Sequence, residues 1–344
     1  MTDPWLDPAT RATLIDNLIQ KLHDHYVFPE VAQQMDAAIR AKAGSGAYDE
    51  LMMLEELCER LTADLQAVSH DKHLRLFYHS ESVPEDEPER PTPEQLEEFR
   101  YAMSLLNFGF ARVERLPGNV GYLDLRGFCP ASVGGEAAVA AMNLLARTGA
   151  LIVDLRQNGG GDPEMIALIT SYLFDQMTNL NNMYWRDGDR TQQFWTLPYV
   201  PGRRYGAGKP VYVLTSSHTF SGAEEFAYNL KNLKRATIVG EVTGGGAHPV
   251  GSFAITPHVG AHIPVGRAVN PISGTNWEGT GVTPDIAVPQ EDALRTAQIL
   301  ALRYVLEQAG DHGAGPLADL VEEARAALAE LEVQEGARDV SSMA

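Results

Sequence analysis

A serine followed by two small residues stands where a buried strand gives way to a helix. The stretch VYVLTSSHTFSGAEEFAYNL (211–230) passes from an apolar strand through a Ser/Thr/Gly turn into a helix that begins after Ser221. At such a junction the serine side chain lies at the carboxyl edge of the sheet, where open α/β sheets bind ligands. The amides that follow, starting with Gly222, are free donors that can stabilise an oxyanion. Ser221 is therefore a candidate nucleophile, and a serine that only caps the helix is the alternative.

A second strand runs into a glycine-rich turn at LIVDLRQNGGGDPEMIALI (151–169). Consecutive glycines let the backbone turn its amides toward a bound group without obstruction from side chains. A plain tight turn and a phosphate loop are the alternatives, and no Lys-Ser/Thr pair follows the glycines as a P-loop requires. We interpret Asp154 and Arg156 as structural partners, and Glu224 and Glu225 as dipole partners in the first turn of the helix after Ser221.

The elements around these loops indicate a layered α/β core with a mostly parallel sheet, because apolar strands alternate with helical patterns. The expected strands cover 120–125, 150–155, 210–215 and 236–241, and the expected helices cover 134–148, 163–176 and 222–233.

The N-terminal region has a helical pattern instead. Apolar residues at i, i+3, i+4, i+7 and i+11 line one side of a first helix: Ile15, Leu18, Ile19, Leu22 and Tyr26. Second and third helices are expected near 31–42 and 49–65. The chain is thus divided into a helical cap (1–72), a connecting strand, acidic linker and helix (73–117), an α/β catalytic core (118–312) and a C-terminal helix and tail (313–344).

Composition limits the class of partner. The formal net charge of -19 argues against nucleic acid or an anionic membrane as the main partner. Two cysteines, Cys58 and Cys129, are too few for a disulfide framework, and no residues have metal-ligand spacing, so neither metal nor cofactor is expected. No apolar run is long enough to span a membrane, and the N-terminus lacks the pattern of a signal peptide, which predicts a cytoplasmic enzyme.

Several motifs in order resemble the tail-specific (C-terminal-processing) serine protease superfamily. They are DLRQNGGG (154–161), SSHTFSGAEEFA (216–227), RATIVGEVTGGG (235–246) and NWEGTGVTPDIAV (276–288). The helical N-terminus with YVFPE (26–30) resembles the branch that contains the interphotoreceptor retinoid-binding protein. The resemblance implies a crotonase-like twisted sheet core and peptide-bond hydrolysis by an activated serine.

The resemblance also implies roles for residues. Many members pair the serine with a lysine, but this chain has TGGGAHP (243–249) at that place, without a lysine. Tricorn-type members use histidine and glutamate, and SHDKHLRL (69–76) matches their histidine motif. The implied set is Ser221 as nucleophile, His73 as base and Glu278 as orienter, with the amides of Gly222 and Gly160 as oxyanion hole. Further candidates for substrate contact are Gly159, Gly161, Thr219, Phe220, Gly245 and His248.

Alternatives remain for the base and for the function. His248 and His70 are the other candidate bases, since histidine has a pKa near the working pH. A peptide or a small acyl compound is the expected substrate. A carrier of retinoid-like or fatty-acid-like ligands, and an esterase or acyl-transfer enzyme, are the competing functions. About 40 residues between His73 and the core leave no room for a PDZ domain. The helix at 316–333 packs on the core or serves as the contact of a homo-oligomer.

Overall fold

The computed structural model describes residues 6–81, 92–310 and 316–342, and the chain divides into two compact units. Unit 1 combines Met1–Gln95, Asn182–Gln193 and Gly246–Val269; unit 2 combines Leu96–Asn181, Phe194–Gly245 and Asn270–Ala344. The helical cap and the α/β core of the sequence analysis correspond to parts of units 1 and 2. Both units, however, are assembled from separate stretches of chain.

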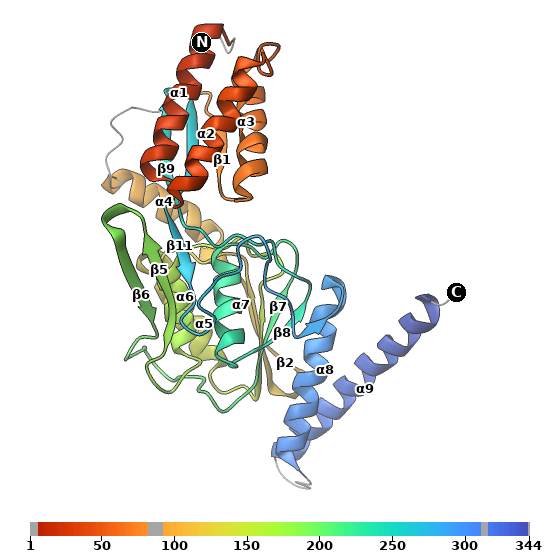
Figure 1. Ribbon diagram of the computed structural model, residues 1–344. Coiled ribbons are helices and arrows are strands. Elements are labelled where there is room, and N and C mark those ends of the chain that lie inside the picture. Colours follow the sequence, from red (N-terminus) through yellow and green to blue (C-terminus); the bar gives the residue numbers. More distant parts are fainter. Residues whose placement is uncertain (1–5, 82–91, 311–315, 343–344) are drawn as a thin grey trace. The chain divides into compact units, whose positions relative to one another are not determined.

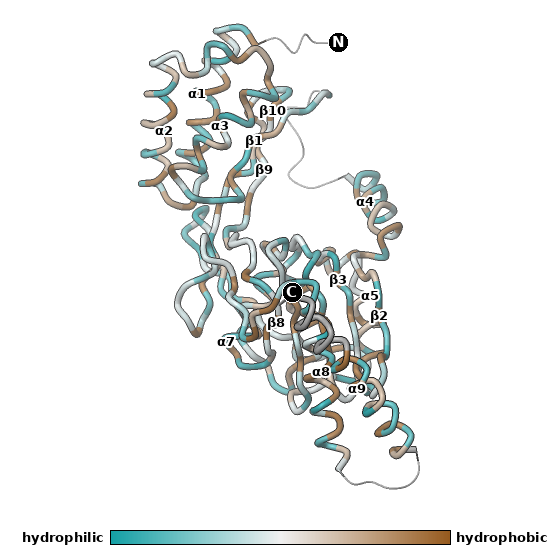
Figure 2. Tube along the Cα trace, turned by 90° about the vertical axis from the view of Figure 1, so that its right-hand side faces the viewer, coloured by the Kyte–Doolittle hydropathy of each residue, from teal (hydrophilic) through white to brown (hydrophobic). Residues whose placement is uncertain are grey.

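Unit 1 begins with the three expected helices, α1 (Pro8–His25), α2 (Pro29–Gly44) and α3 (Leu54–Ser69). The carboxylate of Asp7 accepts hydrogen bonds from the amides of Ala9 and Thr10, which caps α1 at its N-terminus. Figure 2 shows hydrophobic and hydrophilic residues alternating along these helices, as amphipathic helices require.

The apolar side of these helices packs on a three-stranded sheet, and two of its strands come from residues 250–264, far from the helices in the sequence. Its order is β1 (Arg75–Tyr78), β10 (Val259–Pro264) and β9 (Val250–Thr256), and both pairings are antiparallel. Five of its residues belong to the same hydrophobic cluster as the helices: Leu76, Ile255, Val259, Ala261 and Ile263. Strand β1 is the connecting strand expected after residue 73, whereas β9 and β10, which lie within the expected core range 118–312, were not predicted.

A further three-stranded sheet has the order β11 (Gly266–Val269), β5 (Asn179–Trp185) and β6 (Arg190–Trp195). Residues 266–269 pair antiparallel with residues 182–185. None of these strands was predicted either.

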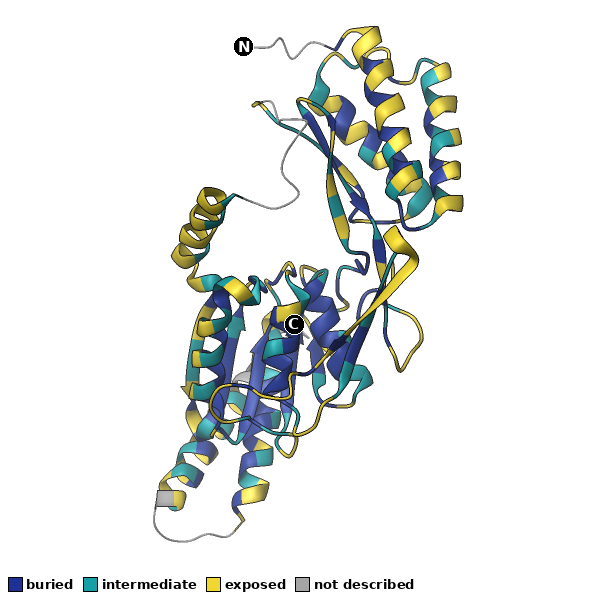
Figure 3. Cartoon of the chain, turned by 90° about the vertical axis from the view of Figure 1, so that its left-hand side faces the viewer, coloured by how far each residue is buried: buried dark blue, intermediate teal, exposed yellow. Residues whose placement is uncertain are grey.

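Unit 2 contains a six-stranded sheet in which only the pairing of its first two strands along the chain is antiparallel. The strand order is β12 (Ile286–Ala287), β8 (Thr237–Gly240), β7 (Val211–Thr215), β4 (Ala150–Asp154), β3 (Val120–Leu125) and β2 (Phe110–Leu116). The prediction of a mostly parallel sheet is confirmed. Figure 3 shows buried residues along the inner strands of this sheet, and β3, β4, β7 and β8 are almost entirely buried, whereas the edge strands β2 and β12 are partly exposed.

Helices cover both faces of this sheet (Figure 1). One face carries α5 (Ala131–Leu145), α6 (Pro163–Ser171) and α7 (Gly222–Asn232). The other face packs on α8 (Gln290–Ala309), whose buried residues join those of the strands in one cluster. Because β4 and β7 are adjacent and parallel, the loops that follow them lie at the same edge of the sheet.

The C-terminal helix α9 (Pro316–Ser342) packs against unit 2 in its first half. Val321 and Ala324 are buried, and the Arg115 guanidinium pairs with both carboxylate oxygens of Glu323. Helix α4 (Pro93–Leu105) precedes the sheet and is confirmed, while residues 82–91 of the expected acidic linker lie outside the described residues. Among the described helices, none combines the length and the apolar character that crossing a bilayer demands.

Core packing in unit 2 gives a first prediction. Leu302 is 2% exposed in the cluster between α8 and the sheet, so Leu302→Ala leaves a cavity there. We expect the free energy of unfolding to fall by about 2–5 kcal/mol, measured by urea denaturation. Leu144 is 64% exposed, and Leu144→Ala is the matched control, expected to change it by less than about 0.5 kcal/mol. Equal losses in both variants would contradict the assigned core.

Candidate functional site

The turn that carries Ser221 is fastened to the loop after the neighbouring strand β4. The Ser216 hydroxyl donates to the carbonyl oxygen of Arg156 at 2.6 Å. The Thr219 hydroxyl donates to the carbonyl oxygen of Leu155 at 2.8 Å, and both hydroxyl-bearing residues are fully buried. Thr219, named above as a candidate substrate contact, therefore uses its side chain to hold the turn.

Ser221 adopts a backbone conformation that residues with a Cβ seldom take. Its φ is 53° and its ψ is -121°, although it stands at the N-cap of α7. An ordinary N-cap residue lies in the extended region, so capping does not require this conformation. Holding a non-glycine residue in such a region costs about 1–3 kcal/mol, and residues of this kind cluster at functional sites. Simple helix capping is therefore a poor account of Ser221.

The glycine loop approaches this turn so closely that Gly160 has no room for a side chain. A Cβ on Gly160 would lie 2.7 Å from the Gly222 nitrogen and 2.8 Å from the Ser221 Cβ. Gly160 also has a φ of 110°, which favours glycine. The missing side chain leaves the space beside the Gly222 amide and the serine unobstructed.

Two amides of these loops are available as donors. Within the described residues no hydrogen bond from the Gly222 or the Gly161 amide is found. The amide of Gly160, which the sequence analysis assigned to the oxyanion hole, donates instead to the Asn158 side-chain oxygen at 2.8 Å. Gly159 is open on its Cβ side, with nothing within 4 Å. The structure thus makes Gly161 a second candidate donor beside Gly222.

Glu224 links the serine to the loop after β8. One carboxylate oxygen accepts the Ser221 amide at 2.9 Å, and the other accepts the Thr243 hydroxyl and the Gly245 amide, the latter at 2.6 Å. The side chain is completely buried. Glu224 lies in the first turn of α7, as expected for a dipole partner, and its carboxylate also bonds the loop after β8. Its burial was not visible in the sequence, because acidic residues in a first helical turn are normally exposed.

Glu225 is buried as well. Burial raises its pKa to about 7, an effect that hydrogen bonds from Asn181 and Asn229 partly oppose. It lies in the first turn of α7, where it was expected as a dipole partner.

Glu278 lies in a loop that is bonded to the 243–245 segment within unit 2. The Gly279 amide donates to the Gly245 carbonyl oxygen at 3.1 Å, and the buried Trp277 packs against Tyr228 with ring centroids 5.3 Å apart. The amide of Glu278 itself donates to Asn276. The motif that named Glu278 therefore belongs to the same unit as the serine.

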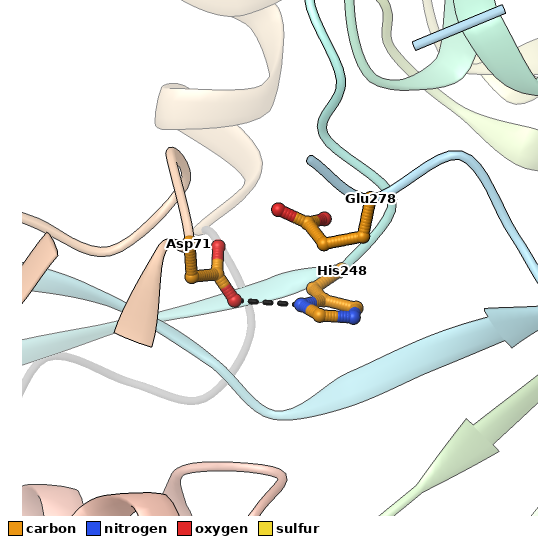
Figure 4. A group of neighbouring side chains, drawn as sticks. All are labelled: Asp71, His248 and Glu278. Atoms are coloured by element: carbon orange, nitrogen blue, oxygen red, sulfur yellow. Dashed lines mark hydrogen bonds and ion pairs between the residues drawn. The ribbon is translucent and has the colours of Figure 1, made fainter. Parts of the chain in front are cut away.

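Unit 1 contains an aspartate–histidine pair that the sequence analysis did not single out. The Asp71 carboxylate lies 2.6 Å from Nδ1 of His248 (Figure 4), and these residues are only 1% and 6% exposed. Because an ionised carboxylate can only accept, Nδ1 of the ring is the donor in this bond. The same arrangement orients the base of serine hydrolases. A signal existed in the sequence, since Asp71 lies within SHDKH.

His73 shares this carboxylate through its backbone. Its amide donates to the other oxygen of Asp71 at 3.1 Å, and its ring is buried. Burial lowers the pKa of His73 to about 4, although the nearby Asp71 charge opposes the shift. The ring is therefore neutral at pH 7. His70 instead ends α3 in the left-handed conformation, with a φ of 56°.

The predicted site residues thus fall into two sets, each held together inside its own unit. Unit 2 holds the nucleophile turn, the glycine loop and the Glu278 loop. Unit 1 holds His73 and His248, joined through Asp71.

Comparison with known proteins supports the family resemblance that the sequence motifs indicate. The model of peptidase family S41 matches residues 119–288. The model described as the N-terminal domain of that family in eukaryotic IRBP matches residues 9–110. Carboxyl-terminal-processing peptidase 2 of Arabidopsis thaliana, a chloroplastic protein, is 27% identical over 197 residues. That match includes 52% of this chain and 35% of the relative, so the chain spans about a third of the relative's length.

Solved structures support the fold. A peptidase candidate from Parabacteroides merdae has a TM-score of 0.57 at 19% identity, over 88% of this chain and 99% of that one. A lipoprotein from Streptococcus agalactiae has a TM-score of 0.56 at 13% identity, over 88% and 100%. The tricorn protease has a TM-score of 0.53 at 13% identity, over 86% of this chain and 37% of its own. With the two family models on successive parts of its sequence, this chain belongs to peptidase family S41.

Proposed function

We propose that the protein is a serine peptidase of the tail-specific kind that cleaves peptides with Ser221 as nucleophile. The observation that carries the proposal is the strained backbone of Ser221, set against a glycine loop that keeps the Gly222 amide accessible. A capping serine needs neither feature, whereas an acyl-transfer nucleophile needs both an exposed hydroxyl and nearby donors.

The reaction follows from these groups. The Ser221 oxygen attacks the carbonyl carbon of the scissile bond while its proton passes to a neutral histidine. The amide of Gly222, with that of Gly161, stabilises the negative charge on the carbonyl oxygen. The histidine then gives the proton to the leaving nitrogen as the carbon–nitrogen bond breaks. Water, activated by the same histidine, hydrolyses the acyl-enzyme and regenerates the serine.

Two histidines of unit 1 are candidates for this base. His73 is the residue that the family motif names, and its low pKa keeps the ring in the neutral form that accepts a proton. His248 has the better oriented ring, because the buried Asp71 binds its Nδ1. We propose His73 as base and Glu278 as its orienting carboxylate, with His248 as the alternative base.

The finer features of the family are also part of the proposal. We infer a crotonase-like twist of the six-stranded sheet and no PDZ domain between His73 and β3. Peptides or small acyl compounds are the proposed substrates, and the helix at 316–333 is the proposed contact for a homo-oligomer. A carrier of apolar ligands remains the competing function, and the first experiment below distinguishes it.

The nucleophile and base are tested by labelling with a fluorophosphonate probe. We expect the wild-type protein to be labelled at Ser221, and Ser221→Ala to abolish labelling. His73→Ala should slow labelling at least about 100-fold, whereas His248→Ala should slow it less. The reverse order would assign the base to His248. An unlabelled, folded wild-type protein would contradict the peptidase and favour the carrier.

The low pKa of His73 predicts an unusual pH profile. If His73 is the base, kcat/KM for a peptide should stay level from pH 7 to about pH 5 and fall with a midpoint near 4. A midpoint near the ordinary histidine value would rule out His73. Between pH 6.5 and 4 the unfolded chain binds more protons at His73 than the folded protein does, so the free energy of unfolding also falls as the pH falls. Circular dichroism at each pH therefore checks that the protein is still folded when its rate is measured.

The open space at Gly160 gives a third test. In Gly160→Ala the new methyl group lies 2.7 Å from the Gly222 nitrogen, where the oxyanion is expected. We expect a loss of kcat of about 100-fold or more. Gly274→Ala is the control, because Gly274 also has a positive φ, 68°, but nothing within 4 Å of the added atom. If Gly274→Ala loses as much activity as Gly160→Ala, the strain of a side chain at positive φ would explain the loss without any block of the oxyanion site.

A further inference from the structure

We infer that Glu224 is the positioning residue that holds Ser221 in its strained conformation and fixes the segment that leads to His248. The backbone of Glu224 forms a capping box with the Ser221 side chain, and its carboxylate touches no reacting atom in this proposal. It acts through two hydrogen bonds to backbone amides, one on each of the segments it joins.

The first bond bears on the nucleophile. The Ser221 amide donates to a carboxylate oxygen of Glu224 at 2.9 Å. This bond fixes the plane of the peptide that precedes Ser221 and hence restricts its φ of 53°. Without an acceptor at this place, the serine loses one of the contacts that oppose its return to a common backbone region.

The second bond bears on the loop after β8. The Gly245 amide donates to the other oxygen of Glu224 at 2.6 Å, and the Thr243 hydroxyl donates to the same oxygen. Gly245 is the last residue of its stretch in unit 2, and the chain enters unit 1 at Gly246. His248 follows three residues after Gly245, a span of no more than about 11 Å for a fully extended chain. Glu224 therefore anchors the near end of the segment that carries His248.

The carboxylate chemistry of Glu224 suits this role better than a neutral amide would. Its two oxygens accept from three donors, the amides of Ser221 and Gly245 and the hydroxyl of Thr243. Glutamine has the same shape but only one acceptor oxygen. In Glu224→Gln its NH2 group must face either the Ser221 amide or the Gly245 amide, and both are donors.

A kinetic experiment tests whether Glu224 positions Ser221. This experiment rests on the proposed function, in which Ser221 is the nucleophile. In Glu224→Gln we expect fluorophosphonate labelling of Ser221 and kcat to fall roughly 10- to 100-fold, with KM within twofold of wild type. Glu224→Asp keeps the charge on a shorter side chain, so its labelling rate and kcat should lie between those of wild type and Glu224→Gln. Labelling of Glu224→Gln within twofold of wild type would overturn the proposal.

Asp285→Asn is the matched control. This carboxylate also accepts a backbone amide, that of Ile238 at 2.8 Å, but at β8 and outside the nucleophile turn. We expect it to lower the melting temperature and to leave labelling within twofold of wild type. A similar loss of labelling in Asp285→Asn would show that general destabilisation, and not positioning, explains the effect of Glu224→Gln.

A stability cycle tests the same role without any activity. Glycine tolerates the backbone conformation of Ser221, so Ser221→Gly should raise the melting temperature by about 2–6 °C in the presence of Glu224. In the Glu224→Gln background, where the serine has relaxed, the same change should raise it by less than about 1 °C. Equal gains in both backgrounds would overturn the positioning role. If the wild-type protein is not labelled, only the proposed peptidase activity is contradicted. The stability cycle would still decide whether Glu224 positions Ser221, because it needs no activity.

Discussion

Two stretches of backbone after adjacent parallel strands approach each other with no side chain between them. Gly160 and Gly222 allow this contact, since a Cβ on either would lie under 3 Å from backbone atoms of the other loop. The close approach needs neighbouring strands in a fixed register. Strands β4 and β7 provide this register through four residue pairs. Helices on both faces of the sheet keep that register by burying the strands. The nucleophile turn therefore depends on the packing of unit 2 as a whole.

Much of unit 2 could be predicted from the sequence, because its signals are local. Buried parallel strands appear as continuous apolar runs, and residues 120–125, 150–155 and 210–215 were all assigned correctly. The glycine loop and the serine turn were each predicted to follow a buried strand, as they do after β4 and β7. Neither inference needed knowledge of a distant partner.

Unit 1 could be predicted only in its helices. Strands β9 and β10 are short, and their buried residues contact helices more than 180 residues away in the sequence. Periodicity reports that one side of a segment is buried but does not identify the partner. The pair of Asp71 and His248 was missed for the same reason, since 177 residues separate the two side chains.

Buried charge shows where the fold departs from what stability alone favours. Asp154 lies beside the Arg156 guanidinium, so its charge is balanced within the sheet edge. Glu224 accepts hydrogen bonds from two amides and a hydroxyl within unit 2. A buried carboxylate held by neutral donors keeps much of its desolvation cost, and an apolar residue of similar size would avoid that cost. Such a group is well suited to hold two backbone amides in a fixed geometry, which connects the burial of Glu224 to the strained serine three residues before it.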